Sequence, residues 1–248
     1  MMEALRIADG VAVITGAASG IGTGLARRAV SLGMRVVLAD VRPGPLETFA
    51  GTLSGEVLAV PTDVTDPQSV EALAVRAWEA FGGVDLRAFV PRMLTAGRRA
   101  HIVNTASVGG FLPSPLMAPY TATKFAVVAL TESLHGELAM LDAPIGVSLL
   151  APGPVRTGIM DDPFGADVHP AVRGFVDTLR QMLSEHGLTP DELAERVFTG
   201  IVEGRYWLFP QPETIDEPLR RRTEAILARR TPLNPLPVAA AARAAADP

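Results

Sequence analysis

Short apolar runs alternate with longer segments of helical periodicity along most of the chain, and this alternation restricts the fold more than any other feature. Strand-like runs, which are bounded by turn residues, cover 10–16, 34–40, 56–64, 100–107, 145–153 and 205–210. Helix-like segments cover 21–33, 66–82, 120–140 and 189–204. Because strands separated by helices form parallel βαβ units, the sequence predicts an α/β fold: a doubly wound, mostly parallel sheet with helices on both faces.

Capping residues mark the starts of two of these helices. Asp66 precedes Pro67, which suits the first helical position. Thr189 and Glu192 form a predicted capping box, with Pro190 between them. These signals strengthen the prediction of helices over 66–82 and 189–204.

The chain of 248 residues fits one large domain, predicted here over residues 1–230. Hydrophobic residues make up 48% of it, which is ample for a core. The Pro- and Ala-rich tail, 231–248, is expected to be loosely ordered.

Charge and cysteine content exclude several classes of function. The net charge of −5 argues against a nucleic-acid or anionic-membrane partner. The chain has no cysteine, which excludes disulfides, thiol catalysis and thiolate metal sites. The N-terminal ten residues do not resemble a signal peptide, and no apolar run is long enough to span a membrane. We therefore expect a cytoplasmic protein.

The stretch TGAASGIG, residues 15–22, follows the first predicted strand and opens the first predicted helix. Gly16, Gly20 and Gly22 allow a tight turn and a close approach of the backbone to a pyrophosphate, and the helix N-terminus adds a partial positive charge. The context favours a dinucleotide site. The alternative is a glycine-rich turn that binds no ligand.

Asp40 ends the second predicted strand, eighteen residues after Gly22. An acid at this place can accept hydrogen bonds from the two ribose hydroxyls of adenosine and repels a 2′-phosphate. Arg42 lies two positions further on and can weaken that repulsion. The pattern favours NAD over NADP, and the alternative is a solvated aspartate at a strand end.

Ser107, Tyr120 and Lys124 form a third constellation. Lys124 follows Tyr120 by four residues, so both lie on one face of a helix. An ammonium near a phenol stabilises the phenolate, as a general acid/base requires, and a serine on the preceding strand can bind the substrate oxygen. A chance Y-x-x-x-K pair is the alternative, although the chain has only two tyrosines.

Taken together, the sequence resembles the short-chain dehydrogenase/reductase family of NAD(P)-dependent oxidoreductases. The matching motifs, in the family's order, are TGAASGIG, LAD, TDV, NTASVGG, YTATK and PGPVRT, between about residues 10 and 212. The resemblance implies a Rossmann-like fold and the interconversion of an alcohol and a carbonyl by hydride transfer.

The resemblance also implies roles for single residues. Tyr120 would be the general acid/base, Lys124 would bind the nicotinamide ribose and Ser107 would orient the substrate. The implied cofactor-binding residues are Gly16, Ser19, Gly20, Ile21, Gly22, Asp40, Asp63, Val64, Tyr120, Lys124, Val155 and Thr157. The four histidines match no catalytic place in the family, and no spacing suggests a metal site.

One segment departs from the family pattern. The family has a fourth strand, an Asn-Asn-Ala-Gly loop and a long helix with a further catalytic asparagine between the places of Asp85 and His101. Here only fifteen residues separate these two positions, and the loop is missing. A crossover needs a dozen or more residues beyond the strand itself, so the sequence indicates an internal deletion near residues 85–86.

Two arrangements can follow from this deletion. Residues 84–90 can serve as a short replacement strand that ends at or before Val90, and we slightly prefer this arrangement. Alternatively 86–97 stays helical, and the first strand pairs with the strand at 101–107 or leaves a gap of about 9–10 Å. Pro91 argues against a regular central strand through its position.

Two classes of function remain open: an active or impaired dehydrogenase, and a non-catalytic dinucleotide-binding relative or inactive deletion product. We expect a small-molecule substrate and a weakened homo-oligomer, because the deletion shortens a helix that forms the dimer interface in the family. Residues 158–188 are expected to cover the substrate. Their apolar side chains fit an apolar ligand or the packing of a lid helix equally well: Ile159, Met160, Phe164, Val172 and Phe175.

Overall fold

A computed structural model describes residues 7–81, 89–163 and 170–232. The strands are β1 (Val11–Thr15), β2 (Arg35–Asp40), β3 (Val57–Pro61), β4 (Ala100–Thr105), β5 (Ile145–Leu150) and β6 (Trp207–Leu208). The α-helices are α1 (Gly20–Ser31), α2 (Pro43–Ala50), α3 (Pro67–Phe81), α4 (Val90–Ala96), α5 (Ala118–Met140), α6 (Pro170–His186), α7 (Pro190–Val202) and α8 (Asp216–Leu227). Three short 3₁₀ helices are η1 (Val108–Gly110), η2 (Gly158–Met160) and η3 (Pro212–Thr214). The predicted tail falls almost entirely outside the described residues, so the proposed domain boundary stays a prediction.

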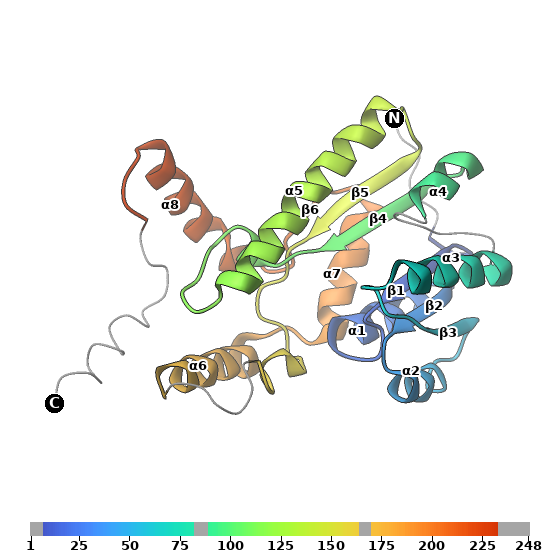
Figure 1. Ribbon diagram of the computed structural model, residues 1–248, viewed down its shortest axis with the longest axis horizontal. Helices are drawn as coiled ribbons and strands as arrows, with labels where there is room; N and C mark the ends of the chain where they lie inside the picture. Colours follow the sequence, from blue (N-terminus) through green and yellow to red (C-terminus); the bar gives the residue numbers. More distant parts are fainter. Residues whose placement is uncertain (1–6, 82–88, 164–169, 233–248) are drawn as a thin grey trace.

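The six strands form two parallel sheets, in the orders β1-β2-β3 and β4-β5-β6. Val13 pairs with Val37 in the first sheet, and Ile102 pairs with Val147 in the second. Helices cover both faces, and the two sheets stand side by side (Figure 1). The predicted α/β, Rossmann-like doubly wound fold is confirmed.

The place of the missing strand lies between β1 and β4. Among the described residues, no strand pairing joins these two edges. Residues 84–88 lie outside the described part of the chain, but Val90 begins helix α4. Pro91 suits the first turn of a helix, because an N–H group there has no partner within the helix, and Gly97 ends α4 in the left-handed conformation with φ 60°. The described residues therefore show a helix from Val90 onward, and the choice between the two arrangements stays a prediction.

Two apolar clusters, one on each face of the sheets, hold the molecule together. Val36 and Leu38 point into one cluster, and their neighbour Val37 points into the other, as the alternation of a strand requires. Each cluster continues into the second sheet, through Leu150 on one face and Val147 on the other. The two sheets therefore share their cores although their strands are not paired.

Helix α7, which lies between β5 and β6 of the second sheet in sequence, packs closely on α1, which follows β1 of the first. A Cβ on Gly24 would lie 2.2 Å from the Pro190 carbonyl oxygen, so only glycine allows this approach. Arg27 forms a 2.7 Å ion pair with Asp191, the second residue of α7. The predicted capping box is confirmed: Thr189 Oγ1 accepts from the Glu192 N–H, and the Thr189 N–H donates to the Glu192 carboxylate.

Candidate functional site

The glycine-rich turn leads directly from β1 into α1. Gly16 and Gly20 have φ values of 66° and 54°, which favour glycine. A Cβ on Gly22 would lie 2.2 Å from the Gly16 carbonyl oxygen, so the first helical turn can lie against the β1 end only with glycine there. Ser19 makes no side-chain cap for α1. The N-terminus of α1 therefore keeps the N–H groups and partial positive charge that bind an anionic group.

Asp40 lies buried at the carboxyl end of β2, beside this turn. One carboxylate oxygen, Oδ2, accepts from the Ala18 N–H at 3.1 Å, and Oδ1 accepts from the Arg42 backbone N–H and Nε, each at 3.1 Å. Burial raises the pKa of the Asp40 carboxyl, but the hydrogen bonds from Arg42 and Ala18 outweigh it and hold the pKa below its ordinary value. Asp40 is therefore ionised, and these hydrogen bonds hold its carboxylate in one orientation.

The Arg42 guanidinium also donates from Nη2 to Ser19 Oγ at 3.0 Å. It thus joins the end of β2 to the turn before α1. The sequence suggested only that Arg42 softens the charge of Asp40. The bridge to Ser19 depends on the two loops meeting in space, which local sequence does not specify.

Asp63 and Val64 follow β3, at the same carboxyl end of the first sheet as Asp40 and the glycine turn. Asp63 Oδ1 accepts from the Thr65 Oγ1 hydroxyl and backbone N–H, at 2.7 and 2.8 Å. These two hydrogen bonds lower the pKa of the exposed Asp63 carboxyl. Val64 is 60% exposed, as a residue free to contact a ligand would be. Ile21 differs, because it packs against the apolar core beneath the turn.

The loop after β5 reaches the glycine turn from the second sheet. Val155 is buried and bridges to Leu188. A Cβ on Gly20 would lie 3.0 Å from Thr157 Cγ2, which places the PGPVRT segment against the glycine turn. A cavity of about 610 Å³ opens there, lined among others by Gly20, Thr157 and Met160.

The segment expected to cover a substrate lies beside this cavity. Phe175 of α6 is 3% exposed and Ile159 of η2 is 53% exposed. Arg180 of α6 donates to the carbonyl oxygens of Met160 and Asp161, at 2.9 Å each, and so fixes α6 to η2. The buried Phe175 packs the helix, whereas Ile159 remains open to a ligand. Phe164 lies outside the described residues.

Ser107 and Tyr120 meet at the carboxyl end of β4. Ser107 caps η1, and its Oγ accepts from the Gly109 N–H at 3.1 Å. A Cβ on Gly109 would lie 3.1 Å from Tyr120 Cε1 and 3.6 Å from Ser107 Oγ, so glycine leaves room for the ring beside the serine. The fold therefore brings together two of the three predicted catalytic residues.

Lys124 lies one turn further along α5. Its Nζ is 5.7 Å from the centre of the Tyr120 ring and donates to the Thr105 carbonyl oxygen at 3.2 Å. Burial lowers the pKa of the Lys124 ammonium. The sequence did not single out Thr105, because a backbone carbonyl as partner leaves no mark in the residue pattern.

Asn104 does not take the place of the asparagine missing from the family pattern. Its Nδ2 donates to Thr131 Oγ1 of α5 at 3.1 Å, so its side chain is held against α5.

The predicted site residues thus divide between the two sheets. The glycine turn, Asp40 and Asp63 belong to the first sheet, whereas Ser107, Tyr120 and Lys124 belong to the second. The facing edges of β1 and β4, which no strand pairing joins in the part of the chain that the structure describes, lie between these groups. In the described ranges no cluster of three or more histidine or acidic residues could hold a metal ion, and none of the described helices is long and apolar enough to cross a membrane.

Comparison with known sequences decides the family. The profile described as short chain dehydrogenase matches residues 10–87 and 86–165. The chain belongs to the short-chain dehydrogenase family. A C alpha-dehydrogenase from a Sphingobium species is 31% identical, over 95% of this chain and 91% of the relative. A 1-deoxy-11-beta-hydroxypentalenate dehydrogenase from Streptomyces avermitilis is 31% identical, over 83% of this chain and 86% of the relative.

Solved structures of short-chain dehydrogenases agree with this assignment. A short-chain dehydrogenase/reductase from Burkholderia phymatum, in complex with NAD, is 35% identical, with a TM-score of 0.88 over 94% of this chain and 99% of that one. A 3-ketoacyl-(acyl-carrier-protein) reductase from Brucella melitensis, complexed with NADH, is 27% identical, with a TM-score of 0.65 over 82% of this chain and 97% of that one.

The same comparisons support the internal deletion. The family profile matches in two pieces that meet at residues 86 and 87. The alignment with the Sphingobium relative runs over 283 positions, whereas 95% of 248 residues is about 236, so about 47 positions are filled by the relative alone. The place where the two matches meet lies between α3 and α4, in the chain segment that joins the two sheets.

Proposed function

We propose that this short-chain dehydrogenase is an NAD(P)-dependent oxidoreductase that interconverts an alcohol and a carbonyl in a small molecule, with NAD as the favoured cofactor. The observation that carries the proposal is the meeting of Ser107 and Tyr120 around Gly109, with Lys124 one turn away. The NAD-bound Burkholderia structure and the dehydrogenase relatives support the same class of reaction.

The residues at the carboxyl end of the first sheet form a suitable binding site for the adenosine half of a dinucleotide. A Cβ on Gly22 would meet the Gly16 carbonyl oxygen, so glycine lets the first turn of α1 pack directly against the end of β1. This packing leaves the α1 N-terminus open to a pyrophosphate. Asp40 is an anion at the place that binds ribose hydroxyls, which favours NAD. When bound, the nicotinamide supplies the hydride acceptor or donor.

Tyr120, Lys124 and Ser107 handle the proton at the substrate oxygen. In the oxidation direction, the alcohol carbon loses a hydride and the alcohol oxygen loses its proton to the Tyr120 phenolate. The reverse reaction returns both. Lys124 Nζ lies 5.7 Å from the centre of the Tyr120 ring, and the Ser107 hydroxyl would donate a hydrogen bond to the substrate oxygen.

We propose further that turnover is slow. The two groups of site residues are carried by sheets whose facing strands are not paired among the described residues. A displacement of about 1 Å between reacting groups can cost about a hundredfold in rate. The same observation favours a second candidate, a relative that binds a dinucleotide without catalysis, since the glycine turn, Asp40 and Asp63 all lie within one sheet.

Binding and turnover separate the two candidates. Titrations with NADH and NADPH, followed by the fluorescence of Trp78 and Trp207, measure binding. Single-turnover assays on a panel of alcohols and ketones measure the chemistry. We expect NADH to bind more tightly than NADPH and turnover to be slow. Binding without detectable single turnover supports the second candidate, and tighter NADPH binding contradicts the choice of NAD.

The chain provides a matched control for the mechanism. Tyr120→Phe should abolish turnover and leave NADH binding within about twofold. Tyr206→Phe removes the chain's other phenol, which has no hydrogen-bond partner in the described residues, and should leave turnover unchanged. Residual turnover that survives Tyr120→Phe would refute the assignment of the general acid/base.

A further inference from the structure

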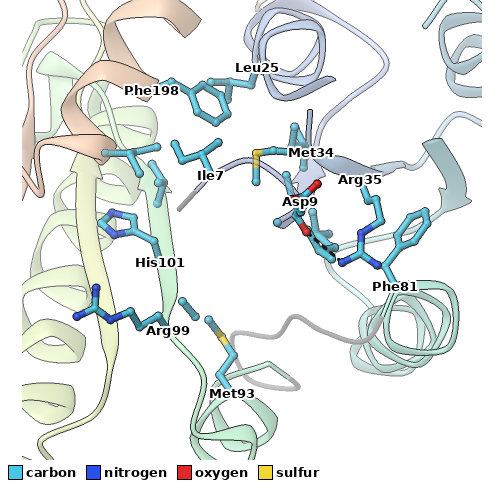
Figure 2. A pocket seen from close by; sticks show the side chains of 18 of the residues that line it. Ile7, Asp9, Leu25, Met34, Arg35, Phe81, Met93, Arg99, His101 and Phe198 are labelled. Atoms are coloured by element: carbon cyan, nitrogen blue, oxygen red, sulfur yellow. Dashed lines mark hydrogen bonds between the residues drawn. The ribbon is translucent and has the colours of Figure 1, made fainter. Parts of the chain in front are cut away.

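A cavity of about 420 Å³ lies between the facing edges of the two sheets. All five residues of β1 line one side of it, and His101, Val103 and Thr105 of β4 line the other. Figure 2 shows side chains from both sheets and from the helices around it. The cavity is distinct from the catalytic trio and from the glycine turn, although both strands end at the site.

The backbones of both strands face this cavity at alternate residues. The Arg35 N–H donates to the Gly10 carbonyl oxygen at 2.9 Å, so the alternation directs the backbone groups of Val11 and Val13 away from β2. The Ala100 N–H donates to the Pro144 carbonyl oxygen at 3.1 Å, which likewise directs the groups of His101 and Val103 away from β5. Within the described residues, strand pairing satisfies neither row, and unpaired backbone groups are costly when they are buried.

Apolar side chains cover the cavity on both faces, and its lining also includes the charged residues Asp9, Arg35, Arg98 and Arg99. Leu25 and Phe198, from α1 and α7, line one face. Met93 and Phe81, from α4 and α3, line the other. A strand that is buried on both faces has aliphatic residues at consecutive positions. An extended segment of this kind would fit the cavity.

We propose that this cavity binds one extended aliphatic peptide segment, about five residues long and supplied by another polypeptide, which completes the sheet. The length follows from the five residues of β1 and the six of β4. An extended backbone can pair with two edges at once, whereas a small apolar ligand fills the space and leaves both rows unpaired. Pairing by strand addition is an established mode of peptide recognition. The proposal holds whether or not the chain catalyses a reaction.

The test uses a fluorescein-labelled peptide with the sequence RVVLAD, which is that of β2, a strand already buried along most of its length. The control peptide RVPLPD keeps an apolar character but lacks two N–H donors. Fluorescence anisotropy of the full chain should show saturable binding of the first peptide and at least tenfold weaker binding of the second. Equal binding of both would assign the cavity to apolar ligands in general, and binding of neither would refute it as a strand site.

Hydrogen exchange locates the bound peptide. On saturation, the amides of Val13 and Val103 should exchange at least tenfold more slowly, while that of Ile14, which faces β2, stays unchanged. A bulky residue in the cavity wall, Ala96→Trp, should weaken binding at least tenfold. The matched variant Ala139→Trp, on the exposed face of α5, should not. Saturable binding without protection at Val13 and Val103, or binding unaffected by Ala96→Trp in a folded chain, would overturn the proposal.

Discussion

His101 should make the stability of the fold depend on pH. It lies on β4 with its Nε2 2.7 Å from Ser148 Oγ, and Ser148 Oγ donates to the Arg205 carbonyl oxygen at 2.6 Å. The serine has one proton, so Nε2 carries the hydrogen that joins them. The other ring nitrogen, Nδ1, lies against Gly146, where a Cβ would come within 2.5 Å of it. Burial lowers the pKa of His101 to about 4.

The sign of the effect follows from this lowered pKa. Between about pH 6.5 and pH 4 the unfolded chain binds a proton at His101 and the folded chain does not. The stability from a neutral His101 is therefore complete above pH 6.5 and is lost as the pH falls. Each pH unit in this window costs about 1.4 kcal/mol, so lowering the pH from 7 to 5 should remove about 2 kcal/mol from the free energy of unfolding.

Urea unfolding at pH 7 and pH 5 measures this loss, and His101→Gln provides the matched control. Glutamine keeps a donor for Ser148 but does not titrate. The parent chain should lose about 2 kcal/mol more than the variant between the two pH values. An equal loss in both proteins would show that other groups set the pH dependence and that His101 titrates normally in the folded state.

Three further predictions concern the cofactor and the assembly. Gly22→Ala should weaken NADH binding at least tenfold by calorimetry, because its Cβ would meet the Gly16 carbonyl oxygen, whereas Gly44→Ala, with open space around it, should bind normally. Arg42→Ala removes a cation from beside Asp40 and should raise the preference for NADH over NADPH; an unchanged ratio in paired titrations would contradict this. A dimer interface built from α4 and α5 should be weak at most, since α4 has seven residues, and sedimentation equilibrium showing a tight tetramer at low concentration would refute this prediction.

The sequence predicted the elements that have a clear apolar period, with ends displaced by at most three residues. It did not predict α2, which contains Pro43 and Pro45. Both prolines fall in the first helical turn, where a missing N–H costs no hydrogen bond. Helix α8 was also missed: its run of charged residues hides a helix that buries only Ala225 fully.

The site was predictable to the extent that its residues lie in contiguous motifs. The four-residue step from Tyr120 to Lys124 and the glycine spacing both translate directly into geometry. The bridge from Arg42 to Ser19 and the bond from Lys124 to the Thr105 carbonyl join segments far apart in sequence. The division of the site between two sheets follows from a missing segment, which the sequence revealed only through its spacing.

The close packing of α7 on α1 has a consequence for how the chain can be divided. A cut between α3 and α4 would leave one fragment with β1, β2 and β3 and the other with β4, β5 and β6. The surfaces that rejoin them are the glycine contact at Gly24, the Arg27–Asp191 and Arg28–Glu195 ion pairs and the two shared cores. One fragment would carry the dinucleotide turn and the other the catalytic trio. The two fragments would thus resemble those of a split reporter, in which activity returns only when the fragments reassemble.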